Sequence, residues 1–372
     1  MRRILAGLLV AGTLVVPATV AAPAAAALRP TDPGYAREWG VMRTRVNEAW
    51  SVTKGRSRVT IAIVDTGVSP LPDLAGRLRP GHDFVNDDDD PRDDNGHGTM
   101  AAGVAAAAGY NGIGIAGVCW YCRILPVKVL DAKGGGNYAD IADGIRYAAD
   151  QGAAIISLSL GGNDDSPLLR DAVTYADAKG ALVVAAAGNQ GSPQPHYPGA
   201  IPSVLSVGGV DEHDARYSWS NYGPSWVDVT APGCNPAQQR DGSLGEYCGT
   251  SSATPFVAGI AGLLASTDPA PSAADIRTAL TGGRVDALRA LAALPHADHT
   301  APTMKIYPQA RFIRVRASDT SGVARLELVV NGKVTSRYAG YLHGFPIPAR
   351  AKSVVIRAYD RVGNLRTALV RR

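Results

Sequence analysis

The sequence predicts an α/β fold, with a mostly parallel sheet flanked by helices, followed by a small C-terminal all-β sandwich domain. Two observations predict the first part: short apolar runs rich in β-branched residues recur along the chain, and helical patterns separate them. The second part is indicated by alternating runs after residue 302, two of which flank an Asn331-Gly332 dipeptide typical of a two-residue hairpin turn.

Five apolar runs are typical of buried parallel strands: residues 59–64, 124–129, 154–160, 181–187 and 204–207. Between them, residues 138–149 place Ile141, Ile145 and Ala148 on one helical face, and residues 168–178 repeat this pattern. Helices of this kind cover the faces of a parallel sheet. Because ligands bind at the carboxyl ends of the strands in such sheets, we expect the functional groups where these runs end.

The first 27 residues predict a cleavable secretory signal, because Arg2 and Arg3 precede an apolar run that ends in an alanine-rich stretch. About 345 residues remain after its removal, which favours a large domain and a small one. Residues 28–295 form the large domain, with short helices expected over 272–280 and 285–294. Residues 296–302 are polar and end in proline, as a linker would. Residues 303–372 predict an immunoglobulin-like β-sandwich, with strands over 305–317, 324–330, 333–338 and 353–359.

The composition excludes several classes of partner. No later segment offers the ~20 uninterrupted apolar residues of a membrane helix, so we expect no membrane contact. The net charge is only +4, without a clustered basic patch interleaved with aromatic residues, so we expect no nucleic-acid partner. We expect a secreted, extracellular monomer.

Four cysteines in an exported chain favour disulfides, and the expected pairs are Cys119–Cys122 and Cys234–Cys248. The Cys-Trp-Tyr-Cys segment alone is also compatible with a thioredoxin-like motif or half of a zinc site. It follows no suitable strand-to-helix turn, however, and the other two cysteines lack the matching spacing. A bridge between Cys234 and Cys248 would close a loop immediately before Ser251 and hold that residue in register.

Three separated motifs form a hypothesis for nucleophilic catalysis. Ser251 lies between a glycine turn and an apolar helical run, Asp65 ends an apolar run, and His97 enters a helix of small residues. A serine hydroxyl needs a base within hydrogen-bond reach, and a carboxylate can hold the imidazole of that base in the useful tautomer. Taken alone, Asp65 is better explained as a solvated turn carboxylate and His97 as a helix-capping residue, so the hypothesis depends on their joint occurrence.

The chain resembles the subtilisin-like serine proteases from about residue 32 to 265. The order Asp, His, Ser is that of the family, and Ala185-Ala186-Ala187-Gly188-Asn189 looks like its oxyanion-hole loop. The resemblance implies a catalytic domain at 28–295 and a secreted serine endopeptidase that cleaves polypeptides through a covalent acyl-enzyme. It also selects Ser251 over the neighbouring Ser252, since the family's serine directly follows Gly-Thr, and it makes Asn189 an oxyanion donor.

Two other functions compete with this interpretation. The first is a catalytically silent relative that acts as an extracellular binding protein, against which the complete set of three residues argues. The second is an α/β-hydrolase, which would need Gly-x-Ser-x-Gly and the order Ser, Asp, His; neither is present.

The resemblance also implies the substrate-binding segments. Two of them look like the family's substrate-flanking strands, and glycine there would let an extended peptide approach the backbone. Their residues are Gly134, Gly135 and Gly136, and Ser159, Leu160 and Gly161. The first specificity pocket would be lined by Ala186, Ala187 and Gly188, with His196 near its base. The alternative for both segments is a flexible surface turn.

Structural calcium is the expected cofactor. The acidic run resembles a calcium loop of thermitase-like subtilases, which implies Asp83, Asn86, Asp88 and Asp90 as ligands. Arg92 departs from that pattern, and the alternative is a solvated acidic loop. A stronger family site would combine Asp32, Asp73 and Asn111 with the carbonyl groups of Ile113 and Ile115.

Overall fold

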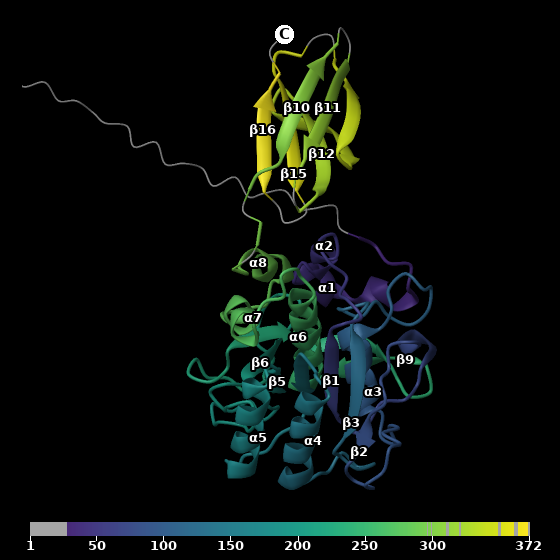
Figure 1. The fold of residues 1–372 in the computed structure, drawn as a ribbon, viewed down its shortest axis with the longest axis vertical. Coiled ribbons are helices and arrows are strands. Elements are labelled where there is room, and N and C mark those ends of the chain that lie inside the picture. The colour runs from purple at the N-terminus through teal and green to yellow at the C-terminus, as the bar shows by residue number, and fades with distance from the viewer. Residues whose placement is uncertain are drawn as a thin grey trace, which may run out of the picture.

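The structure is a computed structural model that describes residues 28–295, 297–298, 300–309, 312–319, 321–348, 351–360 and 364–370. A large α/β body carries a smaller β domain at one end (Figure 1). The expected signal at residues 1–27 lies outside the described residues, as do residues 296 and 299 of the expected linker.

A seven-stranded sheet with parallel pairing throughout forms the centre of the large body, in the order β2-β3-β1-β4-β5-β6-β7. All five predicted runs are strands of this sheet, so the prediction of an α/β fold is confirmed. The strands are β1 (Thr60–Asp65), β2 (His82–Asp83), β3 (Arg123–Lys128), β4 (Ile155–Leu158), β5 (Leu182–Ala186), β6 (Leu205–Val210) and β7 (Val229–Pro232).

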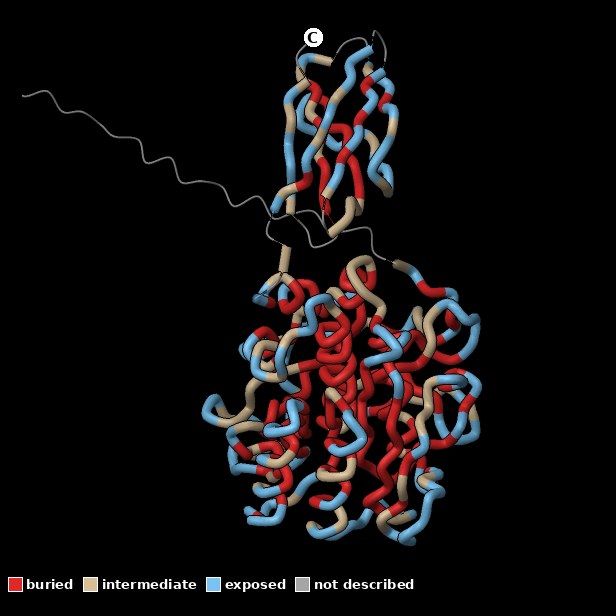
Figure 2. Tube along the Cα trace, viewed as in Figure 1, coloured by how far each residue is buried: buried red, intermediate tan, exposed pale blue. Residues whose placement is uncertain are grey.

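Helices cover both faces of the sheet and create two apolar cores (Figure 2). Alternate residues of β1 lie in different cores. Ile61 and Ile63 pack with α3 and α6, whereas Ala62 and Val64 pack with α4 and α5. The longer helices are α3 (His97–Ala106), α4 (Tyr138–Asp150), α5 (Pro167–Ala178) and α6 (Thr250–Ala265). The shorter ones are η1 (Pro33–Arg37), α1 (Trp39–Arg43), α2 (Val46–Ala49), η2 (Pro72–Leu74), α7 (Ala273–Leu280) and α8 (Ala287–Ala292).

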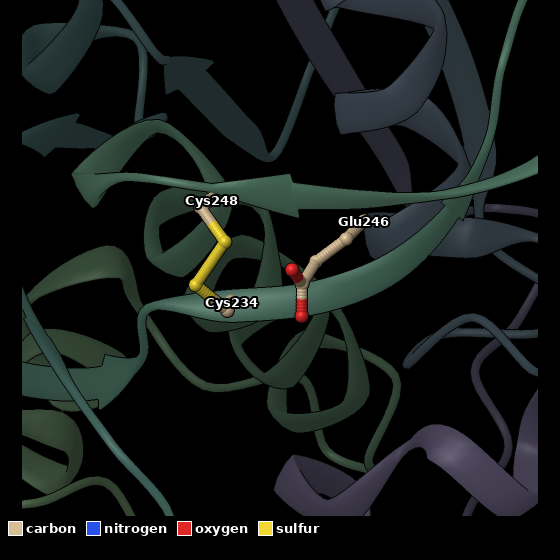
Figure 3. Close-up of side chains that lie close together, drawn as sticks. All are labelled: Cys234, Glu246 and Cys248. Atoms are coloured by element: carbon tan, nitrogen blue, oxygen red, sulfur yellow. A yellow bond between two sulfur atoms is a disulfide. The ribbon is translucent and has the colours of Figure 1, made fainter.

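A hairpin of β8 (Cys234–Gln238) and β9 (Leu244–Cys248) leads into α6. Cys234 and Cys248 are paired in register and joined by a disulfide (Figure 3). One residue later, the Gly249 amide donates to the Gly233 carbonyl, which continues the pairing up to the start of α6. A second disulfide joins Cys119 to Cys122, both fully buried beside α6.

The C-terminal domain is a sandwich of two antiparallel sheets, β10-β11-β14 and β13-β12-β15-β16, which share one apolar core. The Asn331-Gly332 hairpin is confirmed: both residues have positive φ, as a two-residue turn requires. The single run over 305–317 is wrong, because it contains two strands that pair with each other. The strands are β10 (Thr303–Pro308), β11 (Phe312–Ser318), β12 (Val323–Val330), β13 (Lys333–Ala339), β14 (Leu342–Pro346), β15 (Val354–Asp360) and β16 (Leu365–Leu369).

In the part of the chain that the structure describes, none of the helices combines the length and the apolar character needed to cross a bilayer.

Candidate active site

The three residues of the catalytic hypothesis come from neighbouring elements at one edge of the sheet. Asp65 is the last residue of β1, and His97 is the first residue of α3. Ser251 is the second residue of α6, whose first turn approaches the ends of β4 and β5. The carboxyl edge of the parallel sheet therefore collects the residues that the sequence separates by up to 186 positions, from Asp65 to Ser251.

Asp65 and His97 form a short, partly desolvated pair. His97 Nδ1 lies 2.7 Å from Asp65 Oδ1, and the Asp65 side chain is only 1% exposed. Since a carboxylate can only accept, Nδ1 carries the hydrogen and the lone pair of Nε2 faces away from Asp65. A second acceptor contact, from the Thr66 amide to Asp65 Oδ1 at 2.7 Å, fixes the carboxylate.

Asp93, which the sequence analysis missed, holds the loop that presents His97. This buried carboxylate accepts from the Thr66 hydroxyl, from the amides of Asn95 and Gly96, and from both the amide and the hydroxyl of Thr99. It thereby connects the end of β1 to the first turn of α3. The sequence feature that could have indicated Asp93 is its position four residues before His97. The polar run around it, however, is equally explained by turn formation.

Four effects set the pKa of His97. Burial of the ring is the largest effect and lowers the pKa, but the charge and hydrogen bond of Asp65 and the charge of Asp93 raise it. The balance leaves the pKa of His97 above its ordinary value of 6.5. These surroundings thus stabilise the imidazolium more than water does, which helps a base that must hold a proton during catalysis.

Ser251 is tied to the end of β4 by two reciprocal hydrogen bonds. Its hydroxyl donates to the Ser159 carbonyl at 3.2 Å, and the Ser159 hydroxyl donates to the Ser251 carbonyl at 2.8 Å. Gly249, at the N-cap of α6, has φ of +117°, which an L side chain rarely adopts, and so permits the sharp turn before Ser251. Ser252, by contrast, is fully buried and its hydroxyl accepts from Asn235, so it cannot meet a substrate.

Tyr247 is the second residue that the sequence analysis missed. Its hydroxyl lies 3.1 Å from His97 Nε2, and the two rings meet edge to face with centroids 5.2 Å apart. The side chain is buried, which together with the Asp65 charge raises the pKa of Tyr247 well above its ordinary range. The phenol therefore stays protonated and donates to the nitrogen that Ser251 needs, while the Ser251 hydroxyl is directed to the Ser159 carbonyl. The sequence signal was its place four residues before Ser251.

Asn189 follows β5 and is anchored by its amide oxygen. Oδ1 accepts from the Thr250 amide at 2.8 Å and from the Thr250 hydroxyl at 3.0 Å. The amide nitrogen Nδ2 consequently points away from Thr250. Asn189 itself is exposed and lies beside the start of α6. Together with the N–H of Ser251 in the first turn, it provides donors where the helix dipole also favours negative charge.

A hollow of about 500 Å³ lies beside His97, and both predicted substrate segments line it. Gly134 and Gly136 contribute from one side, and Ser159 to Gly161 from the other. Gly135 lies in the same loop, where its amide donates to Asp131. An extended chain entering this hollow would pass within reach of His97.

The residues predicted for the first pocket also lie together. The His196 ring approaches Gly161 so closely that a side chain there would collide with it, and it also lies near Gly188, where a Cβ would be 3.0 Å from the ring. Ala186 ends β5, and both Ala187 and Gly188 are buried between this strand and Asn189. Burial lowers the pKa of His196, which favours a neutral ring.

The predicted calcium set of Asp32, Asp73 and Asn111 converges on the loop at residues 110–115. Asp32 accepts from the amides of Tyr110 and Asn111, and Asp73 accepts from the Asn111 side chain at 2.6 Å and the Ile115 amide. Both carboxylates are buried, and burial, reinforced by the Asp32 charge, raises the pKa of Asp73 to about 6. The amide of Ile113 donates to Asn111, so its carbonyl lies in this loop too.

Two further observations fit a cation in this place. Burial, reinforced by the charges of Asp32 and Asp73, raises the pKa of Glu38 well above its ordinary value, and its buried Oε2 atom has no hydrogen-bond partner among the described residues. A Cβ at Gly114 would lie 2.0 Å from Asp73 Oδ2, so only glycine lets the loop close around this carboxylate. Hard oxygen donors of this kind suit calcium.

The predicted calcium set of the acidic run, residues 83–90, does not fit a cation as arranged. Asp83 accepts from the amides of Val85 and Asn86, and the Asn86 side chain donates to its other oxygen. Asp90 is held by a bidentate contact from Arg92, and Asp88 accepts from the Asp90 amide. Arg92 therefore supplies the positive charge that a bound ion would otherwise provide.

A parallel sheet that brings an aspartate, a histidine and a serine to its carboxyl edge in this order defines the class of the subtilisin-like serine proteases. The chain belongs to the subtilase family: the model described as "Subtilase family" matches residues 56–289. The resemblance noted from the sequence motifs is thereby confirmed.

Named relatives agree with this assignment. Thermitase of Thermoactinomyces vulgaris is 48% identical over 254 residues, which cover 68% of this chain and 90% of thermitase. A "Thermophilic serine proteinase" of Bacillus sp. (strain AK1) is 49% identical over 244 residues, and the match spans 61% of that relative and 65% of this chain. Among solved structures, a protease from Pseudoalteromonas arctica is similar with a TM-score of 0.66 and 30% identity, covering 71% of this chain and 99% of that chain.

Proposed function

We propose that this chain is a secreted serine endopeptidase that hydrolyses peptide bonds of polypeptide substrates through an acyl-enzyme on Ser251. The observation that carries the proposal is the 2.7 Å Asp65–His97 pair at the sheet edge, with Ser251 presented by the adjacent start of α6. The signal at residues 1–27 and the two disulfides support secretion into an oxidising environment. Residues 28–295 act as the catalytic unit, 296–302 as a linker and 303–372 as an accessory β domain.

The substrate lies as an extended strand between residues 134–136 and 159–161, with the side chain before the scissile bond beside residues 186–188 and His196. Ser251 Oγ then turns from the Ser159 carbonyl toward His97 Nε2, and the hydrogen bond from the Tyr247 hydroxyl to Nε2 breaks. Ser251 Oγ bonds to the carbonyl carbon while its proton passes to Nε2. The new oxyanion accepts from Asn189 Nδ2 and the Ser251 amide.

The collapse of this intermediate breaks the C–N bond, and the imidazolium of His97 gives its proton to the departing amine. Water then enters, loses a proton to Nε2 and attacks the acyl carbon, and Ser251 Oγ leaves with the proton returned by His97. Asp65 keeps its charge throughout and stabilises the imidazolium.

Calcium supports the fold in this proposal. Asp32, Asp73 and Asn111, with the carbonyl groups of Ile113 and Ile115, are the residues that would hold it, and the ion would neutralise the buried carboxylates. Asp83, Asn86, Asp88 and Asp90 stay a prediction from sequence, because Arg92 already compensates that loop.

A serine-directed phosphonate tests the assignment of the nucleophile. We expect stoichiometric labelling of the wild type, loss of labelling in Ser251→Ala, and retention in the matched Ser252→Ala variant. Folding of both variants is checked by circular dichroism. Labelling that persists in Ser251→Ala, or a wild type that neither labels nor cleaves a peptide library, contradicts the proposal and favours a silent binding protein.

A further inference from the structure

A second hollow, distant from the catalytic edge, is lined by three arginines from three separate segments. Its volume is about 530 Å³, and Arg56, Arg77 and Arg123 surround it together with Ser57 and Tyr121; no lining residue is acidic. Arg123 begins β3 and pairs in register with Thr60, the first residue of β1. The far end of β1 carries Asp65, so about 16 Å of strand separates this hollow from the triad.

Arg77 is the half-buried member of this set, and the salt bridges of the described residues do not include it. Its Nε atom is inaccessible to solvent, and that atom has no hydrogen-bond partner among the described residues. Burial lowers the pKa of Arg77, and the charge of Asp73 offsets this only in part. The guanidinium carbon lies 5.9 Å from the centre of the Tyr121 ring, which adds no acceptor. A buried cationic donor without a partner is destabilising, so the fold maintains an unfavourable group here.

Several other arginines of the large body are compensated. Arg284 forms an ion pair with Asp214, and Arg45 forms ion pairs with Glu48 and Asp286. Arg170 makes a bidentate contact with Asp165. Arg77 has no ion pair with any described residue. The lack of a carboxylate partner is therefore a property of the surroundings of Arg77, because other arginines of the same domain do form ion pairs.

The surroundings increase the positive charge. At the rim, Asp268 is shared by Arg56 and Arg58, so one carboxylate faces two cations. Arg123 is exposed and forms no ion pair with the described part of the chain. The hollow thus combines a size typical of ligand pockets with an excess of planar N–H donors.

We propose that this pocket, which we call the arginine pocket (Arg56, Arg77 and Arg123), binds a sulfate- or phosphate-type oxyanion. The guanidinium fork matches the geometry of such oxygens, and an anion in the hollow gives Arg77 the negative partner that it lacks among the described residues. The volume accommodates more than one tetrahedral ion, so the oxyanion comes either free in solution or as a substituent of a polymer. Binding here leaves the catalytic edge open.

The test uses the full chain with Ser251→Ala to prevent autolysis, in saturating calcium, because Arg77 lies near Asp73. Sodium sulfate is titrated against sodium chloride of equal ionic strength by calorimetry, and dextran sulfate provides the polymeric probe. We expect saturable sulfate binding that Arg77→Gln weakens by about ten-fold or more, as expected for loss of a charged hydrogen bond. Arg77→Lys keeps the charge but loses the planar guanidinium fork, and it should also weaken binding.

Arg146→Gln is the matched control, because Arg146 is half-buried on α4 and its ion pair is with Asp143 on the same helix. It should bind sulfate as the parent does. Equal affinity per sulfate for ion and polymer indicates a free oxyanion, and much tighter binding of dextran sulfate indicates a polymer; both support the proposal. No saturable binding of either probe, or equal weakening by Arg77→Gln and Arg146→Gln, overturns it. Peptide cleavage by Arg77→Gln in an otherwise native chain should be unchanged, which separates this result from the proposed protease activity.

Discussion

Removal of the Tyr247 hydroxyl should activate the enzyme. In the free protein this hydroxyl donates to His97 Nε2 at 3.1 Å, while Ser251 donates to the Ser159 carbonyl instead. Catalysis needs the lone pair of Nε2 for the proton of Ser251, so the Tyr247 contact must break before attack. Tyr247→Phe removes this competitor and keeps the buried ring in the core beside α6.

The size of the effect follows from the bond that is lost. A neutral hydrogen bond contributes about 0.5–1.5 kcal/mol net. If that free energy is part of the barrier, kcat/KM should rise about 2- to 13-fold. A donor to Nε2 also stabilises the neutral imidazole, so its removal should raise the apparent pKa of His97.

The assay is kcat/KM for a short chromogenic peptide as a function of pH. The groups that face His97 are Asp65 from β1, Asp93 from the loop before α3, and Tyr247 from β9. Activity of Tyr247→Phe should exceed that of the wild type on the alkaline plateau, and the acid limb should move to higher pH. Tyr307→Phe, at an exposed position of β10, is the matched control and should leave both unchanged.

The reasoning is refuted if Tyr247→Phe is no faster than the wild type on the plateau, or if its acid limb moves to lower pH. Either result would mean that the phenol supports the active geometry of the imidazole, and that the contact persists through attack.

Three further outcomes are expected. The acid limb of wild-type kcat/KM should lie above pH 6.5, because the pKa of His97 is raised and only the neutral ring accepts a proton; Asp93→Asn removes a charge that raises it and should shift the limb to lower pH. Chelation should lower the melting temperature by about 5–10 °C if calcium is present at about a hundred times its dissociation constant, measured by scanning calorimetry. Asp73→Asn should abolish that calcium response, and Asp90→Asn should retain it. Replacing both cysteines of the β8–β9 disulfide by serine should lower the free energy of unfolding by about 3 kcal/mol, as for a loop of ~15 residues, and lower kcat; an unchanged denaturant midpoint would contradict this.

Local patterns were sufficient for the framework of the site. The residues that end apolar runs, such as Asp65, are placed by the topology of a parallel sheet, which apolar periodicity already indicates. The Asn331-Gly332 turn was equally readable, because its backbone demands residues that tolerate positive φ.

Features that depend on long-range packing could not be predicted in this way. The contact between Tyr247 and His97 joins residues 150 positions apart, and only the closed fold determines which rotamer the phenol adopts. The run at 305–317 contains two strands because its turn lies inside a stretch of continuous β propensity. The contact of Arg92 with Asp90 depends on side-chain geometry, which composition does not specify.

The reciprocal bonds between Ser159 and Ser251 have a mechanical consequence. When Ser251 Oγ turns away for attack, the bond from the Ser159 hydroxyl to the Ser251 carbonyl remains, and it joins the proposed peptide-binding strand end to the helix that carries the attacking oxygen. If a peptide binds along residues 159–161 as proposed, this bond would transmit its displacement to the start of α6 and keep the alignment on which rapid acylation depends. Tolerance toward substrates with side chains of different size would come from this hydrogen bond. Variants at Ser159 that remove its hydroxyl should therefore narrow the range of peptides that are cleaved well.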